Sequence, residues 1–109
     1  MVMPFDVAVN DDTSTVTMTV TGELDLASAP QLREACAGVL QREPTAVRVD
    51  LSGLTFLDSS GISVLVQLQQ DLEQRDATLV LHRVGERTAR VLEIAGLETF
   101  FARSDQPVE

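Results

Sequence analysis

The sequence predicts an α/β domain built on a mixed sheet of about four to five strands, with helices mainly on one face. Segments that alternate between apolar and polar residues are interleaved with segments of helical periodicity, which favours parallel strands joined by right-handed crossovers. The strand expected at residues 47–51 alternates, whereas strands covered on both faces are continuously apolar. One face of the sheet should therefore lack helices, which argues against a doubly wound nucleotide-binding fold.

The first two strands form a predicted hairpin. Residues 5–9 and 16–20 place apolar side chains at every second position, which is the strand signal. Residues 10–12 (Asn-Asp-Asp) favour a turn, so we expect the hairpin to reverse there. Gly22 is expected to end the second strand.

The first helix should begin at Ser28 and end before Pro44. Ser28 is followed three residues later by Gln31, which is the pattern of a capping box. Pro30 falls in the first turn, where its missing N–H is tolerated. The residues expected to face the core are Leu32, Ala35, Cys36, Val39 and Leu40.

Three further elements are expected after the first helix. They are a strand at residues 47–51 with one solvated face, a second helix starting after Asp58, and a strand at residues 78–82. The inner stripe of the second helix should be Gly61, Val64, Leu65, Leu68 and Leu72.

The third helix should run from about Glu86 to Ala95, with Gly96 after its end. Val91, Leu92 and Ala95 are expected to face inward, and Leu97, Phe100 and Phe101 to fold back onto the core. The whole chain, residues 1–109, should be a single domain with a core from about residue 5 to residue 101 and a flexible tail at residues 102–109.

The composition limits the classes of function. The formal net charge is −9, from 17 acidic and 8 basic residues, and every basic residue is an arginine. Binding to nucleic acid or to an anionic membrane needs clustered basic side chains, so we expect neither. We find no secretory signal and no apolar run near the roughly 20 residues that span a bilayer. With Cys36 as the only cysteine, these features predict a cytoplasmic protein.

The turn from Asp58 to Gly61 (Asp-Ser-Ser-Gly) carries the chemistry of greatest interest. Asp58 or Ser59 can cap the second helix, and Gly61 lets another part of the backbone approach closely. The positive end of the helix dipole also tolerates a negative group on Ser59. From the spacing alone, an ordinary helix cap and a modifiable serine both remain open.

The segment from Val49 to Ile62 resembles the hallmark of STAS domains, particularly the bacterial anti-sigma factor antagonists. Three further blocks are similar to the same pattern: residues 22–25 (Gly-Glu-Leu-Asp), Pro30 with Leu32, and residues 96–97 (Gly-Leu). The resemblance extends from about residue 5 to residue 101, so a STAS-like fold is expected for nearly the whole chain.

This resemblance implies a phosphorylation-controlled binding module. In the family, the serine directly after the aspartate is phosphorylated by a kinase that is itself the anti-sigma factor; here that serine is Ser59. The unphosphorylated antagonist binds the anti-sigma factor and releases an alternative sigma factor, and a serine phosphatase resets it. The resemblance places Asp25, Asp58, Ser59, Ser60 and Gly61 at the partner-binding surface. The role of Asp25 remains open between partner contact and an ordinary turn. Because Ser28 is available to cap the first helix, Asp25 is not needed as its cap.

Other kinds of site find little support. His82 is the only histidine, so a metal site lacks ligands and Ser59 lacks an evident catalytic base. Cys36 lies on an apolar helix face and is expected in the core. No glycine-rich phosphate-binding motif is present. We therefore expect no enzyme activity, no catalytic residue and no cofactor, and a monomer or weak dimer. The alternatives are an unphosphorylated STAS subunit of a lipid-transport or signalling complex and, more remotely, a small serine hydrolase.

Overall fold

A computed structural model of the protein describes residues 4–104. Its elements are β1 (Asp6–Asp12), β2 (Thr15–Leu24), α1 (Ala29–Gln41), β3 (Ala46–Leu57), α2 (Ser59–Glu73), β4 (Thr78–His82), α3 (Glu86–Ile94) and β5 (Ala102–Arg103). The five strands form one mixed sheet in the order β1-β2-β3-β4-β5. β1 is antiparallel to β2, and the other neighbours are parallel. The predicted fold class is confirmed.

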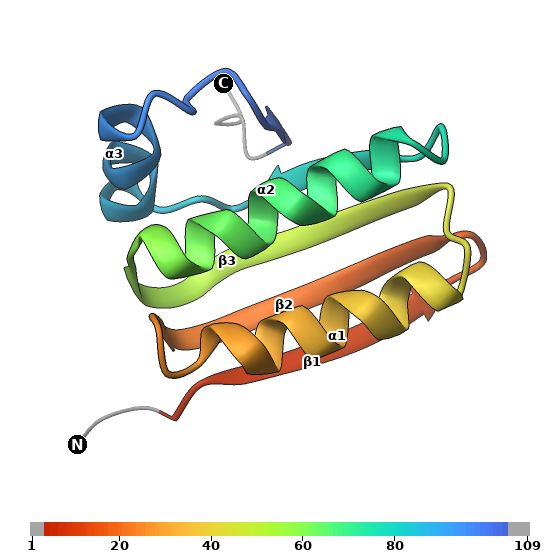
Figure 1. The fold of residues 1–109 in the computed structure, drawn as a ribbon, viewed down its shortest axis with the longest axis horizontal. Coiled ribbons are helices and arrows are strands. Elements are labelled where there is room, and N and C mark those ends of the chain that lie inside the picture. The colour runs from red at the N-terminus through yellow and green to blue at the C-terminus, as the bar shows by residue number, and fades with distance from the viewer. Residues whose placement is uncertain (1–3, 105–109) are drawn as a thin grey trace.

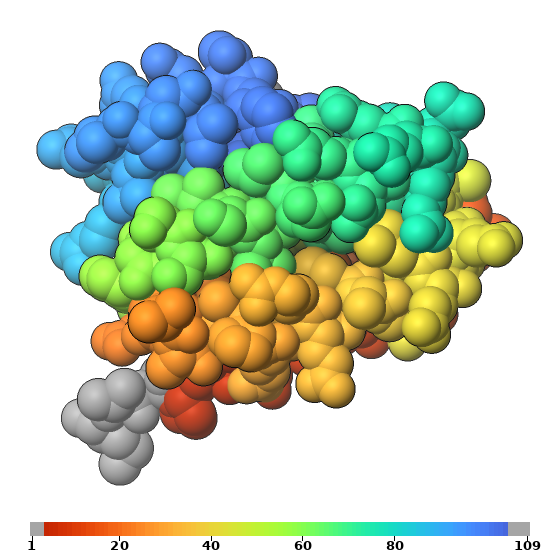
Figure 2. Space-filling view, viewed as in Figure 1, coloured from red at the N-terminus to blue at the C-terminus, as the bar shows by residue number. Residues whose placement is uncertain are grey.

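The helices α1 and α2 lie side by side along one face of the sheet (Figure 1). Their side chains meet over it, with a hollow between them along part of their length (Figure 2). The burial of β2 follows this arrangement. Buried and less buried residues alternate along the strand, and the apolar side chains of Val16, Met18 and Val20 are buried beneath the helices. The threonines between them are only half buried, as expected for a face without helices. α3 packs against β3 instead.

The core consists of one apolar cluster between the sheet and the helices. α2 contributes the residues that its periodicity predicts, namely Gly61, Val64, Leu65, Leu68 and Leu72. Phe101 is buried and Leu97 is partly buried, whereas Phe100 is 36% exposed and packs edge-on against Phe101. The stripe of α2 therefore orients this helix, and its first turn, on the sheet.

Two expectations for the hairpin are wrong. Residues 10–12 belong to β1, whose pairing continues until Asp12 lies opposite Thr15, so Thr13 and Ser14 make the turn. Gly22 does not end β2, which continues to Leu24 through a shift in register. The φ of Gly22 is +92°, and a Cβ there would lie 2.8 Å from the Cα of Phe5. The glycine thus permits an irregular, closely packed strand.

Further corrections concern β3 and the C-terminal part. β3 runs on to Leu57, so the segment expected to join strand and helix is itself strand. Asp50 lies on the face expected to be solvated, yet it is buried. Ala95 is exposed because it follows the last turn of α3 as the C-cap residue. Residues 102–104, expected to belong to a flexible tail, are instead ordered, since β5 pairs with β4 and the N–H of Ser104 donates to the carbonyl of Leu81. Residues 105–109 lie outside the described residues.

Candidate functional site

The carboxyl ends of β2 and β3 bring the predicted site residues to one edge of the sheet. Leu24 lies opposite Leu57 in this parallel pair. The N–H of Asp58 donates a hydrogen bond of 3.2 Å to the carbonyl oxygen of Leu24. The loop that contains Asp25 and the first turn of α2 are therefore neighbours, as Figure 1 shows where the orange and green helices begin.

Asp58 is the N-cap residue of α2. Its backbone is extended (φ −121°, ψ −173°), and its Oδ1 accepts hydrogen bonds from the N–H of Ser60 at 2.9 Å and of Gly61 at 3.4 Å. These bonds satisfy N–H groups that the first turn of a helix leaves unpaired. The sequence left the cap open between Asp58 and Ser59, and the structure assigns it to Asp58.

Ser59 is the first residue of α2, and it is exposed. Its carbonyl oxygen accepts a hydrogen bond of 2.9 Å from the Ser63 hydroxyl. Among residues 4–104, its own hydroxyl has no hydrogen-bond partner. Ser60 differs from Ser59 in burial, since it is half buried, while its backbone N–H donates to Asp58. Ser59 therefore carries the more accessible hydroxyl of this turn.

Gly61 is buried, and its place in the turn is explained by packing. A Cβ at this position would lie 2.3 Å from the Cγ of Leu24, 2.7 Å from its Cδ2 and 3.0 Å from the Cδ1 of Leu57. Leu24 is fully buried, so it has little room to move. Gly61 thus lets the first turn of α2 sit directly on the ends of β2 and β3, and any effect on a partner would be indirect.

Asp25 and Ser28 hold the loop between β2 and α1, and here the expected capping box is wrong. The Ser28 hydroxyl donates to the carbonyl of Glu23 at 2.7 Å and accepts from the N–H of Asp25 at 2.9 Å, so it does not cap α1. The Asp25 carboxylate accepts instead from the N–H of Ala27 at 3.0 Å and of Ser28 at 3.1 Å. Asp25 therefore stabilises the turn before α1, a role that the sequence had assigned to Ser28 as a helix cap.

Asp50 forms a second carboxylate centre, which the sequence did not reveal. Its Oδ1 accepts from the N–H of Ser52 at 2.9 Å, and its Oδ2 pairs with the Arg83 guanidinium at 3.0 Å. Burial alone would raise the pKa of Asp50, but the hydrogen bonds from Ser52 and the Arg83 charge outweigh it and lower that pKa. This ionised, satisfied carboxylate ties β3 to the residue that follows β4. Nothing in the sequence signals that an aspartate at an alternating strand position is buried. Asp50 was therefore not identified from the sequence as a buried carboxylate.

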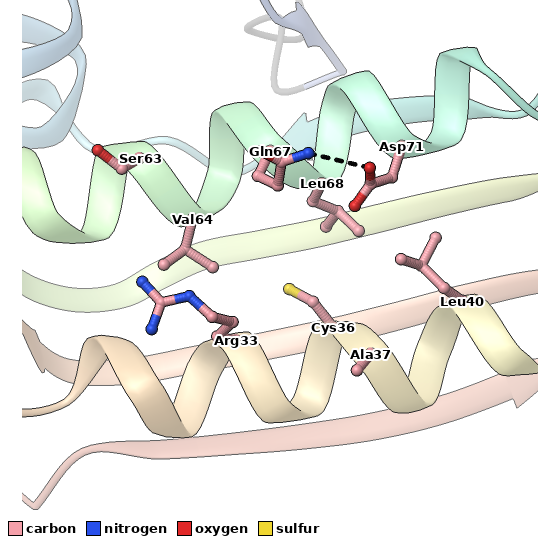
Figure 3. Close-up of a pocket in the computed structure, with 9 residues that line it drawn as sticks. All are labelled: Arg33, Cys36, Ala37, Leu40, Ser63, Val64, Gln67, Leu68 and Asp71. Carbon is pink, nitrogen blue, oxygen red and sulfur yellow. Dashed lines mark hydrogen bonds between the residues drawn. The ribbon is translucent and has the colours of Figure 1, made fainter.

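A groove of about 310 Å³ runs between α1 and α2 (Figure 3). Arg33 and Cys36 point into it from α1, and Asp71 faces it from α2, where it accepts a hydrogen bond of 3.0 Å from Gln67. Burial, together with the Asp71 charge, raises the pKa of Cys36 to about 12, although the Arg33 charge opposes this. The thiol is therefore protonated and is a poor nucleophile. Cys36 is a core residue, as expected.

The remaining candidates for a site are His82, a metal centre and a membrane-spanning helix. His82 Nδ1 lies 2.8 Å from the Ser104 hydroxyl. Across residues 4–104, no three His, Cys, Asp or Glu side chains are grouped so that they could hold a metal ion. In the same range, no helix is both long and apolar enough to cross a membrane.

Exposed apolar side chains are a feature that sequence reasoning missed. The large ones are Leu26, Phe56, Ile94 and Phe100. Leu26 is 77% exposed and lies in the loop held by Asp25 and Ser28, beside the start of α2. Its exposure follows from the tertiary path of that loop, for which the sequence carries no periodic signal.

Comparison with known proteins agrees with this geometry. The family model described as "Mlab, STAS domain" matches residues 7–102. The anti-sigma-B factor antagonist of Listeria monocytogenes is 36% identical over 86 residues, 79% of this chain and 75% of that protein. The anti-sigma-F factor antagonist RsfB of Mycobacterium tuberculosis is 34% identical over 95 residues, 87% of this chain and 77% of that protein.

A solved structure is also similar. The crystal structure of an anti-sigma factor antagonist from Mycobacterium paratuberculosis has a TM-score of 0.83 at 28% identity. The similarity covers 92% of this chain and 85% of that one. With the family model matched over nearly the whole described fold, this chain belongs to the STAS domain family.

Proposed function

We propose that this chain is an anti-sigma factor antagonist, a binding module rather than an enzyme, which sequesters an anti-sigma factor and so releases an alternative sigma factor. Phosphorylation of Ser59 switches this binding off. The observation that carries the proposal is the exposed hydroxyl of Ser59 at the first residue of α2, without a hydrogen-bond partner in the described chain. The names of the similar proteins support the same function.

The division of roles between Asp58 and Ser59 suits a reversible modification. Asp58 caps α2, so a phosphate on Ser59 leaves those hydrogen bonds in place. A phosphoserine adds about −1.5 to −2 charges and three acceptor oxygens. At the positive end of the helix dipole, this charge is tolerated by the fold. The modification therefore changes the surface and preserves the structure beneath it.

The switch acts at the interface through charge and bulk. The added phosphate lies next to Asp58 and on the same edge of the sheet as Asp25, in a protein whose net charge is already −9. A partner surface that accepts the unmodified Ser59 closely has no room for the phosphate, and any acidic group on it is repelled. In this proposal the partner-binding surface consists of Asp25, Asp58, Ser59, Ser60 and Gly61. Asp25 and Gly61 contribute by shaping this surface.

The partners in this proposal are those that the resemblance to anti-sigma factor antagonists implies. The anti-sigma factor is itself the serine kinase that modifies Ser59, and a serine phosphatase restores the binding form. Such exchange takes place in the cytoplasm, with the antagonist as a monomer or weak dimer. The similar proteins are named for anti-sigma factor antagonism, which favours this function over that of a transport or signalling subunit.

The proposal is tested by incubating the chain with candidate anti-sigma factor kinases and ATP, then locating the phosphate by mass spectrometry. We expect one site, at Ser59, and no incorporation in Ser59→Ala. Ser63→Ala is the matched control, because Ser63 is also an exposed serine of α2, one turn further along. Incorporation that persists in Ser59→Ala, or is lost only in Ser63→Ala, would place the switch elsewhere.

A further inference from the structure

Leu26 stands out among the side chains that the proposed function leaves unexplained. It is 77% exposed, so it contributes little to the core. A single exposed leucine is ordinary on a protein surface. What distinguishes Leu26 is its place in the loop after β2, next to the strand end that is hydrogen-bonded to Asp58.

Hydrogen bonds hold the loop that carries Leu26. Both residues that follow Leu26, Ala27 and Ser28, donate their N–H groups to the Asp25 carboxylate. The Ser28 side chain is buried and bridges the backbone of Asp25 and Glu23. The N–H of Ala29 also donates to the carbonyl of Asp25 at 2.8 Å. Little conformational entropy remains to be lost there when a partner binds, which is the condition for a strong apolar contact.

The same hydrogen bonds define what Asp25 does. The two backbone N–H groups that donate to its carboxylate, those of Ala27 and Ser28, lie within its own loop. Such bonds need an oxygen acceptor at this position and do not need a negative charge. Asparagine supplies the same acceptor, whereas alanine supplies none.

We propose that Leu26 is an apolar contact residue for the anti-sigma factor, and that Asp25 is a positioning residue that presents Leu26 through its turn rather than through its charge. This inference rests on the proposed function and deepens it. The partner surface must then offer an apolar depression for Leu26 next to the group that reads Ser59. The hydrogen bond from Asp58 to Leu24 joins the Leu26 loop to the first turn of α2. The proposed contacts of Leu26 and Ser59 therefore lie on one surface.

The first test measures affinity for the anti-sigma factor kinase that phosphorylates Ser59, by isothermal titration calorimetry with unphosphorylated variants. Leu26→Ala should weaken binding at least about tenfold, as truncation of a well-packed interface residue does. Ile94→Ala is the matched control, because Ile94 is 79% exposed and lies on α3. It should stay within about twofold of the wild type, since Ile94 lies outside the two loops of the proposed surface and isolated surface truncations have little effect. Equal affinity of Leu26→Ala and wild type, or equal losses in both variants, would overturn the proposal.

The second test separates position from charge. Asp25→Asn should keep affinity within about threefold of the wild type, whereas Asp25→Ala should lose at least about tenfold. Equal losses in both variants would show that the charge itself is recognised, and would overturn the positioning role. Circular dichroism and thermal unfolding of each variant report whether the fold is retained, and Leu26→Ala keeps the proposal testable if Asp25→Ala is unstable.

The wild type distinguishes failure of this inference from failure of the proposed function. If the wild type binds the kinase and Ser59→Asp weakens binding while Leu26→Ala does not, only the inference has failed. If the wild type does not bind, the proposed function has failed and the inference falls with it.

Discussion

The N–H of Asp58 donates to the carbonyl of Leu24 at 3.2 Å, across the ends of two parallel strands. Asp58 caps the helix that begins with Ser59, and Leu24 directly precedes the turn of Asp25 and Leu26. This bond therefore joins the two loops of the proposed binding surface. Because each loop is also held by its own aspartate, the surface is preorganised before a partner arrives.

Replacement of the cap should destabilise the protein. Asp58→Ala removes the acceptor for the N–H groups of Ser60 and Gly61, and loss of such a cap costs about 1 kcal/mol of unfolding free energy. Asp58→Asn should cost less, because asparagine is also a good N-cap residue. Urea denaturation measures both, and an alanine variant as stable as the asparagine variant would contradict the assigned cap.

Alanine should have opposite effects at two helical glycines. Gly61→Ala places a Cβ 2.3 Å from the Cγ of buried Leu24, and overpacking of this kind costs about 1–3 kcal/mol. Gly38 lies within α1 with nothing within 4 Å of an added Cβ, so Gly38→Ala should stabilise by about 0.5–1 kcal/mol through helix propensity. The two midpoints of urea unfolding should move in opposite directions; an unchanged or raised midpoint for Gly61→Ala would refute the close approach of α2 to β2.

The stability contributed by Asp50 should depend on pH. Its folded-state pKa is lowered from the ordinary 3.8, so its ionised form stabilises the fold above that value, and the contribution is lost as the pH falls. The difference in unfolding free energy between the wild type and Asp50→Asn should therefore shrink between about pH 5 and pH 3. Asp6→Asn, at an exposed position of β1, controls for the loss of one negative charge. A difference that stays constant or grows toward low pH would contradict the Arg83 and Ser52 interactions.

Cys36 should resist thiol reagents in the folded protein. Burial raises its pKa to about 12, so almost no thiolate is present at neutral pH, and the sulfur is shielded as well. Ellman's reagent should react slowly with the native protein and rapidly after unfolding in urea. Native labelling as fast as that of the unfolded chain would show that the groove between α1 and α2 is open.

Sequence patterns predicted the helix that carries the site better than the strands beside it. The stripe of α2 repeats along every turn, so its five buried residues could be named in advance. The extent of β1 and β3 depends on pairing with distant residues, as where Asp12 lies opposite Thr15, and local turn propensity was a poor guide there. Burial of Asp50 likewise depends on Arg83, 33 positions away.

The candidate site was predictable in its positions and less so in its roles. Residue type and spacing placed Asp58 and Ser59 at a helix start, which the structure confirms. The capping box at Ser28 failed because its hydroxyl bonds to the carbonyl of Glu23, a contact that depends on the path of the loop. The exposure of Leu26 depends on the same path.

The central claim is that phosphorylation of Ser59 switches off binding by changing the surface and not the fold. The most direct measurement compares the affinity of the anti-sigma factor for the unmodified chain and for the chain stoichiometrically phosphorylated at Ser59. The account predicts matching circular dichroism spectra and binding at least about tenfold weaker after phosphorylation, a loss of about 1.4 kcal/mol or more. Equal or tighter binding of the phosphorylated chain, or loss of its folded spectrum, would contradict it.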